Sequence, residues 1–91
     1  MNEMKRQLHI LKKAGDLTAR SVIETLSLKE PGLIKVVLIQ DAVDLDPTWK
    51  AETFRLEEDA PLSRSVPERV VRIGYSRLID LIFEADTVVG W

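Results

Sequence analysis

The feature that most constrains the fold is a nearly continuous apolar run at residues 34–39, "IKVVLI". Its β-branched side chains favour a strand. A strand that is apolar at almost every position is typically covered on both faces, as strands of parallel sheets are. The run therefore predicts the central strand of a sheet that has a helical layer on each side.

Strand and helix patterns alternate at both ends of the chain. Residues 7–11 ("QLHIL") predict a short first strand, and residues 70–73 and 87–91 predict two more. A first helix is predicted by the apolar spacing of Ala19, Val22, Ile23 and Leu26, with Asp16 as its candidate N-cap. A second helix is predicted by the same spacing at Tyr75, Leu78, Ile79 and Ile82. Its charged residues, Arg77, Asp80 and Glu84, fall on the opposite side. Pro31 and Gly32 end the first helix. The order predicts one domain over residues 1–91, an α/β three-layer sandwich with a small, mostly parallel sheet of about 4–5 strands.

The middle of the chain, residues 41–69, is harder to interpret. Residues 52–56 ("ETFRL") alternate, with Phe54 and Leu56 on one side, and predict a strand less deeply buried than the central one. The preceding segment, which contains Pro47, barely holds a crossover helix. Either the crossover is truncated, or these two strands are not parallel neighbours. Residues 57–68 predict a polar connection with room for one helical turn.

Composition excludes several classes of chemistry. The chain has 91 residues and no cysteine, so disulfides, thiolate nucleophiles and cysteine metal sites are excluded. With His9 as its single histidine, a zinc site is not expected, and we predict no metal, cofactor or catalytic residue. A net charge of −2, with scattered basic residues, argues against direct nucleic-acid binding. A polar N-terminus and short apolar runs predict a cytoplasmic protein without membrane contact.

Polar residues follow three of the predicted strands. In open α/β sheets, ligands bind beyond the carboxyl ends of the strands. Gln40 and Asp41 follow the central strand, Glu58 and Asp59 follow the third, and Lys12 follows the first. These residues form a candidate crevice, and a small α/β protein that binds a metabolite near Asp41 is an alternative function. Charged residues also end strands simply because they enter solvent, and Asp41 can instead order the following turn.

Four other residues are candidates for particular roles. His9 lies on the strand face opposite Leu8, where a structural imidazole is more common than a catalytic base. Trp49, Tyr75 and Trp91 are candidate interface residues, since aromatic side chains are enriched at interface centres. Trp91 can equally cap a core. The helix at residues 75–84 can serve as an interaction surface in a plain α/β module.

Four motifs, in order, resemble the DsrH/TusB family of sulfur-relay subunits, which have the DsrE-like fold. They are "LH" at Leu8 and His9, "LIQDAV" at residues 38–43, "RLEED" at residues 55–59, and "IGYSRLIDLIFEADTVVGW" at residues 73–91. The resemblance covers nearly the whole chain, and it rests on the order and spacing of the motifs.

The resemblance implies a three-layer fold and assembly with related subunits. Such subunits join into dimers or hexamers that pass persulfide sulfur, for 2-thiolation of the tRNA wobble uridine or in sulfur oxidation. The sulfur travels on cysteines, chiefly those of the DsrE/TusD-type partner. Since this chain has no cysteine, the resemblance implies a non-catalytic subunit that assembles with itself or with DsrE/DsrF-like (TusD/TusC-like) subunits. The segment after Asp41, "DLDPTWKA", is shorter than in the family. The family often places a subunit interface in this region, so the partner of this chain can differ from the family's usual partners.

Overall fold

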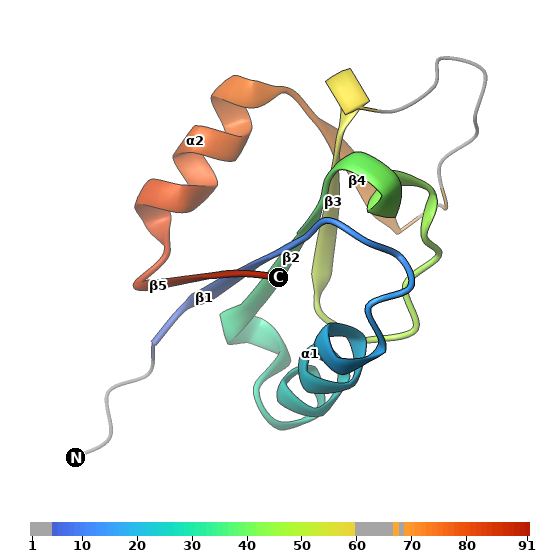
Figure 1. Cartoon of the computed structure of the whole chain (residues 1–91). Helices are drawn as coiled ribbons and strands as arrows, with labels where there is room; N and C mark the ends of the chain where they lie inside the picture. Colours follow the sequence, from blue (N-terminus) through green and yellow to red (C-terminus); the bar gives the residue numbers. More distant parts are fainter. Residues whose placement is uncertain (1–4, 60–66, 68) are drawn as a thin grey trace.

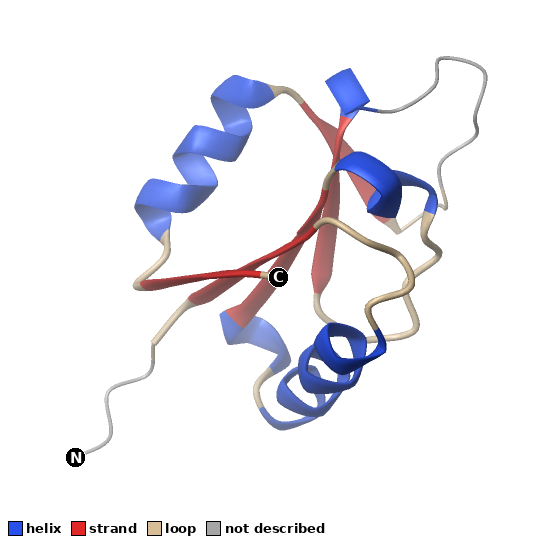
Figure 2. Cartoon of the chain, in the orientation of Figure 1, coloured by secondary structure: helices blue, strands red, loops and turns tan. Residues whose placement is uncertain are grey.

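The computed structural model describes residues 5–59, 67 and 69–91, which form a five-stranded parallel sheet between two helices (Figure 1). The spatial order of the strands is β4-β3-β2-β1-β5. The elements are β1 (Gln7–Leu11), α1 (Leu17–Lys29), β2 (Ile34–Leu38), β3 (Glu52–Leu56), β4 (Val70–Ile73), α2 (Tyr75–Glu84) and β5 (Thr87–Gly90). Helix α1 covers one face of the sheet and α2 the other (Figure 2). The predicted three-layer α/β sandwich is confirmed, and every strand pair of the sheet is parallel.

Strand β2 is covered on both faces, as its apolar run predicts. Val36 packs into the α1-side core, which consists of Leu11, Ala19, Ile23, Ile34, Val36, Leu38, Ala42, Leu45, Trp49 and Ala51. Val37 packs into the α2-side core, which consists of Leu8, Val37, Phe54, Ile73 and Leu81. The alternation of Val36 and Val37 between the two cores follows from the period of two in a strand.

Helix α1 begins and ends at the predicted signals. The Asp16 carboxylate accepts a hydrogen bond from the backbone N–H of Ala19 (3.0 Å), so Asp16 is the N-cap. After Lys29, Pro31 opens a short 3-10 turn that leads directly into β2. The turn sets the distance between α1 and the start of the central strand.

The crossover between β2 and β3 is truncated, and the two strands are parallel neighbours. A 3-10 helix, Gln40–Asp44, takes the place of a full crossover helix and buries Ala42 and Val43. Arg69, just before β4, donates from its guanidinium to the carbonyls of Pro47 (3.3 Å), Trp49 and Ala51 (3.1 Å). These bonds hold the remainder of the short connection against the sheet.

Strand β3 is more deeply buried than predicted. Its residues Thr53, Phe54, Arg55 and Leu56 are all buried, so the expectation of a shallow strand is wrong. The reason is topological, because β3 lies between β2 and β4 and therefore has neighbours on both sides. The polar connection predicted after β3 begins with a 3-10 turn, Glu57–Asp59, and the rest of it lies mostly outside the described residues.

Helix α2 turns a different face to the sheet than the predicted stripe. The residues packed against the α2-side core are Leu78 and Leu81. Four apolar residues of the helix remain exposed, and we call them the outer α2 face: Tyr75, Ile79, Ile82 and Phe83. The stripe could not be oriented correctly because the apolar arc of this helix is wider than the strip that the sheet covers, so spacing alone fits two rotations.

Candidate functional site

Two of the residues predicted at the carboxyl ends of the strands come together. The backbone N–H of Gln40 donates to the Asp59 carboxylate (2.9 Å). Gln40 has a φ of 51°, in the left-handed region that non-glycine residues rarely adopt. Glu58 lies apart from this pair, and its carboxylate accepts a hydrogen bond from the backbone N–H of Tyr75 (3.3 Å) at the start of α2. Both carboxylates therefore order the backbone.

Asp41 and Lys12 do not join these contacts. Both are exposed, and no hydrogen bond or ion pair holds either side chain within the described part of the chain. The turn-ordering role considered for Asp41 is carried out by Asp59, nineteen residues after Gln40 in the chain. The five predicted crevice residues thus lie at one end of the sheet without forming one cluster, and metabolite binding near Asp41 stays a prediction.

Replacing Asp59 with alanine is expected to lower the free energy of unfolding by about 1 kcal/mol, since the Gln40 amide loses its acceptor. Asp41→Ala removes an exposed carboxylate and is expected to change the free energy of unfolding by less than about 0.5 kcal/mol. Urea denaturation of the two variants checks this order. A larger effect at Asp41 would show that Asp41, and not Asp59, orders the turn.

His9 is held in one tautomer between Trp91 and Gln7. The Trp91 indole N–H donates to His9 Nδ1 (3.1 Å), and His9 Nε2 lies 3.0 Å from Gln7 Oε1. An indole nitrogen can only donate, so Nδ1 is the acceptor and the proton is on Nε2. Burial lowers the pKa of His9, which favours the neutral ring. The imidazole is structural, and Trp91 packs against the α1-side core as a cap.

Stability is expected to fall as the pH drops through the titration of His9. The unfolded histidine has a pKa of about 6.5, while the pKa of the folded one is lower, so the unfolded chain binds the extra proton first. The free energy of unfolding should therefore decrease as the pH falls from about 7.5 through the unfolded pKa, and level off below the folded pKa. Urea denaturation at several pH values measures the slope of the free energy of unfolding against pH.

His9→Gln is the control for this slope, because an amide does not titrate. The variant should lose the pH dependence in this window. Asp86 does not interfere, since the backbone N–H of Arg6 holds the pKa of its carboxyl below the usual range of an aspartate. An unchanged slope in His9→Gln would mean that another group titrates there.

The three candidate interface residues lie in different surroundings. Trp49 is 1% exposed, in the α1-side core, and its indole N–H donates to Thr53 Oγ1 (2.8 Å). Its assignment to an interface is therefore corrected, because a partner cannot reach a core side chain. Trp91 is partly buried. Tyr75 is 54% exposed and belongs to the outer α2 face, where a partner can contact it.

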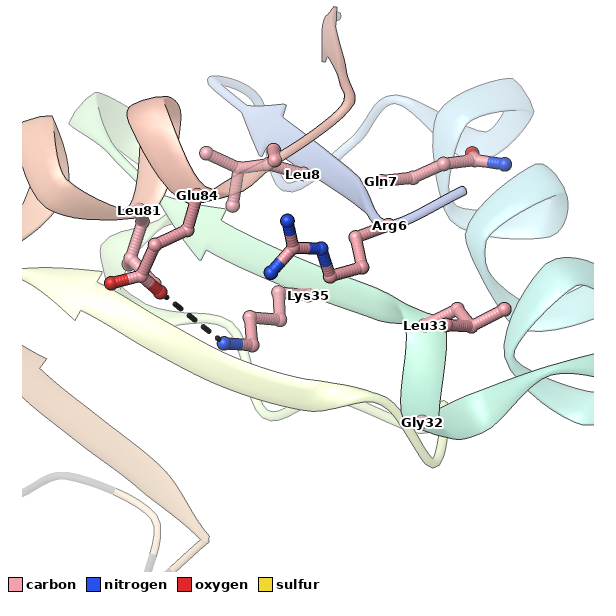
Figure 3. Close-up of a pocket in the computed structure, with 9 residues that line it drawn as sticks. Arg6, Gln7, Leu8, Gly32, Leu33, Lys35, Leu81 and Glu84 are labelled. Atoms are coloured by element: carbon pink, nitrogen blue, oxygen red, sulfur yellow. Dashed lines mark ion pairs between the residues drawn. The ribbon is translucent and has the colours of Figure 1, made fainter. Parts of the chain in front are cut away.

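A cavity of about 110 Å³ lies at the opposite end of the sheet, beside the last turn of α2 (Figure 3). Its lining consists of Arg6, Gln7, Leu8, Gly32, Leu33, Lys35, Leu81, Glu84 and Ala85. Sequence analysis missed this site. The signal that could have pointed to it is Lys35, the single charged residue inside the apolar run "IKVVLI".

The polar residues of the cavity carry long ion pairs. Lys35 Nζ lies 3.9 Å from carboxylate oxygens of both Glu52 and Glu84. Arg6 Nε lies 3.6 Å from Asp86. All three distances exceed the hydrogen-bond range.

Within residues 5–59, 67 and 69–91, no group of three or more histidine, aspartate or glutamate side chains is placed to hold a metal ion. Neither α1 nor α2 has the length and apolar character that a membrane-spanning helix requires.

An all-parallel five-stranded sheet with one helix on each face is an α/β fold that matches a small DsrE-like sandwich. The crystal structure of the YchN protein from E. coli aligns with the chain at a TM-score of 0.78 and 13% sequence identity, over 97% of this chain and 100% of YchN. This similarity shows the fold alone. No protein-family model matches the sequence, and no curated protein matches it either.

Proposed function

We propose that the chain is a non-catalytic, DsrH/TusB-like subunit of a sulfur-relay complex, serving 2-thiolation of the tRNA wobble uridine or sulfur oxidation. It acts by assembling with itself or with homologous DsrE/DsrF-like (TusD/TusC-like) subunits. The DsrE-like fold and the order of the four sequence motifs support this proposal. A persulfide requires a cysteine thiolate, and the sequence has none, so the sulfur must travel on a partner.

The observation that carries the proposal is the exposed apolar surface on the α2 side. A five-stranded sheet is roughly 20–25 Å wide, whereas a helix with its side chains covers about 10 Å. Helix α2 is the one helix on this face in the described structure, and Phe83 on its outer face is 83% exposed. At the two sheet edges, Val71 of β4 and Val88 of β5 are also exposed. Exposed apolar side chains gathered on one side of a domain are typical of protein contacts.

Phe83→Ser tests the proposal against a matched control, Leu17→Ser. Leu17 is a similarly exposed apolar residue (72%) on α1, on the other side of the sheet. Light scattering after size-exclusion chromatography should show an assembly of the wild-type chain, alone or mixed with DsrE/DsrF-like subunits. Phe83→Ser should weaken this assembly at least about tenfold, the loss expected for a side chain worth over 1.4 kcal/mol. Leu17→Ser should not.

Two outcomes contradict the assembly. One is a wild-type chain that stays monomeric and does not bind those subunits, and the other is equal weakening by both substitutions. The relay role has its own test, in which persulfide-loaded partner subunits supply sulfur to a tRNA-thiolating enzyme, with ATP to activate the uridine oxygen and a thiol reductant, with and without the chain. The chain should raise the yield of thiolated tRNA although it carries no sulfur itself. Intact assembly without such an effect would exclude the relay role alone.

A further inference from the structure

The cavity beside the last turn of α2 has an apolar floor. Leu8 of β1 and Leu81 of α2 belong to the α2-side core, and Gly32 and Leu33 complete the lining next to β2. Its volume of about 110 Å³ is somewhat smaller than the ~150 Å³ cavity known to hold benzene. The apolar part of a ligand in this space is thus limited to about four to six carbon atoms.

Two cations with free donors lie at the mouth of the cavity. Arg6 directly precedes β1, Lys35 lies in the neighbouring strand β2, and their side chains lie beside each other there (Figure 3). Their nearest carboxylates are 3.6–3.9 Å away, beyond hydrogen-bond distance. Within the described residues, the guanidinium and the ammonium therefore keep N–H donors without a protein acceptor. A ligand head rich in acceptors would satisfy them.

Both cations are mounted on fixed backbone. Lys35 lies in the central strand β2. The backbone of Arg6 donates to Asp86 Oδ2 (2.9 Å), and its carbonyl accepts from the N–H groups of Asp86 (2.9 Å) and Thr87 (3.2 Å). Only side-chain rotations are then needed for the guanidinium and the ammonium to contact a ligand, which keeps the entropic cost of binding low.

The charges at the cavity admit at most a singly charged anion. Arg6, Lys35 and Glu84 of the lining sum to +1, and two further carboxylates lie next to them, Glu52 at 3.9 Å from Lys35 and Asp86 at 3.6 Å from Arg6. The Glu84 carboxylate already accepts a hydrogen bond from Arg77 (3.1 Å) and also faces Lys35. It would repel a second negative charge on a ligand, which disfavours phosphate dianions.

We propose that this cavity binds a small aliphatic monocarboxylate, with the carboxylate between Arg6 and Lys35 and a tail of about four to six carbons against Leu8 and Leu81. The opposing structural explanation is that the two cations only offset Glu52, Glu84 and Asp86. Ion pairs formed for that purpose alone do not require an apolar cavity beneath them. The proposal is independent of subunit assembly, since it does not involve the outer α2 face.

A titration with pentanoate tests the site, followed by the backbone amide signals of Gly32 and Ala85 in two-dimensional ¹⁵N NMR spectra. Both residues line the cavity, and Gly15, in the loop after β1, is the distant reference. We expect saturable shifts at Gly32 and Ala85 with a millimolar Kd and none at Gly15. Pentylammonium, which has the same number of carbon atoms and the opposite charge, should bind at least about tenfold more weakly.

Lys35→Met keeps the apolar stem and removes the ammonium, so it should weaken pentanoate binding about tenfold. Lys50→Met, at an exposed lysine before β3, should leave binding unchanged. The spectra themselves report whether each variant is folded, and Arg6→Gln replaces Lys35→Met if the latter is not. Absence of saturable shifts, equal binding of pentylammonium, or unchanged pentanoate affinity in the folded Lys35→Met or Arg6→Gln variant would overturn the proposal.

Discussion

Replacing Trp49 with alanine is expected to lower the free energy of unfolding by about 3–5 kcal/mol, a large part of the stability of a domain of this size. The Trp49 side chain lies in the α1-side core, and its indole N–H is hydrogen-bonded to Thr53. Alanine leaves a cavity that the sheet and the short β2–β3 connection cannot close fully. Urea denaturation followed by circular dichroism measures the loss.

Trp49→Phe keeps the variant measurable if the alanine protein is unfolded. It retains most of the ring but lacks the hydrogen bond to Thr53, so a loss of about 1–2 kcal/mol is expected. Trp91, which is only partly buried, gives the comparison, and Trp91→Phe should cost less than Trp49→Phe. Unchanged stability of Trp49→Ala, together with a weakened subunit assembly, would instead place Trp49 at an interface.

Replacing Arg55 with methionine is expected to raise the free energy of unfolding by about 1–3 kcal/mol. Arg55 is 2% exposed, its Nε has no hydrogen-bond partner, and its Nη1 reaches only the Val43 carbonyl at 3.4 Å. No carboxylate of the described residues forms an ion pair with it. A guanidinium stays charged when buried, so its desolvation is poorly offset. Methionine has a similar length and no charge to desolvate.

Arg72→Met is the control for this substitution. Arg72 is the register partner of Arg55 on β4, but it is exposed and pairs with Glu57 at 3.7 Å. Its replacement is expected to change stability by less than about 0.5 kcal/mol. Urea denaturation of both variants gives the comparison. A destabilised Arg55→Met variant would show that a further group compensates the buried charge.

Local signals in the sequence were enough to predict the elements. The first strand is formed at the predicted residues, and the helix after it begins at its N-cap Asp16. The central strand ends at Leu38, one residue before the end of its apolar run, because the chain then turns through Gln40 with a positive φ. The first strand and the helix N-cap depend on neighbouring residues alone, which is why alternation and capping residues predict them.

Contacts between distant residues could not be predicted in this way. The bond from Gln40 to Asp59 depends on β2 and β3 being neighbours, a choice that the truncated crossover left open. The burial of Trp49 depends on Arg69 holding the loop before β3. The cavity beside α2 exists only because the end of that helix lies over Lys35. Periodicity gives the elements but no information about such pairings.

The strand order has a consequence for how the chain acquires its structure during synthesis. Strands β2, β3 and β4 are added successively on one side of β1, and then α2 carries the chain back across the sheet to place β5 on the other side. Arg6 and Asp86, which join these ends, are 80 residues apart. Such closure is slow, because a long loop must be ordered first. Until α2 emerges from the ribosome, Leu8, Val37 and Phe54 have no helix over them, so the nascent domain presents a surface suited to chaperones.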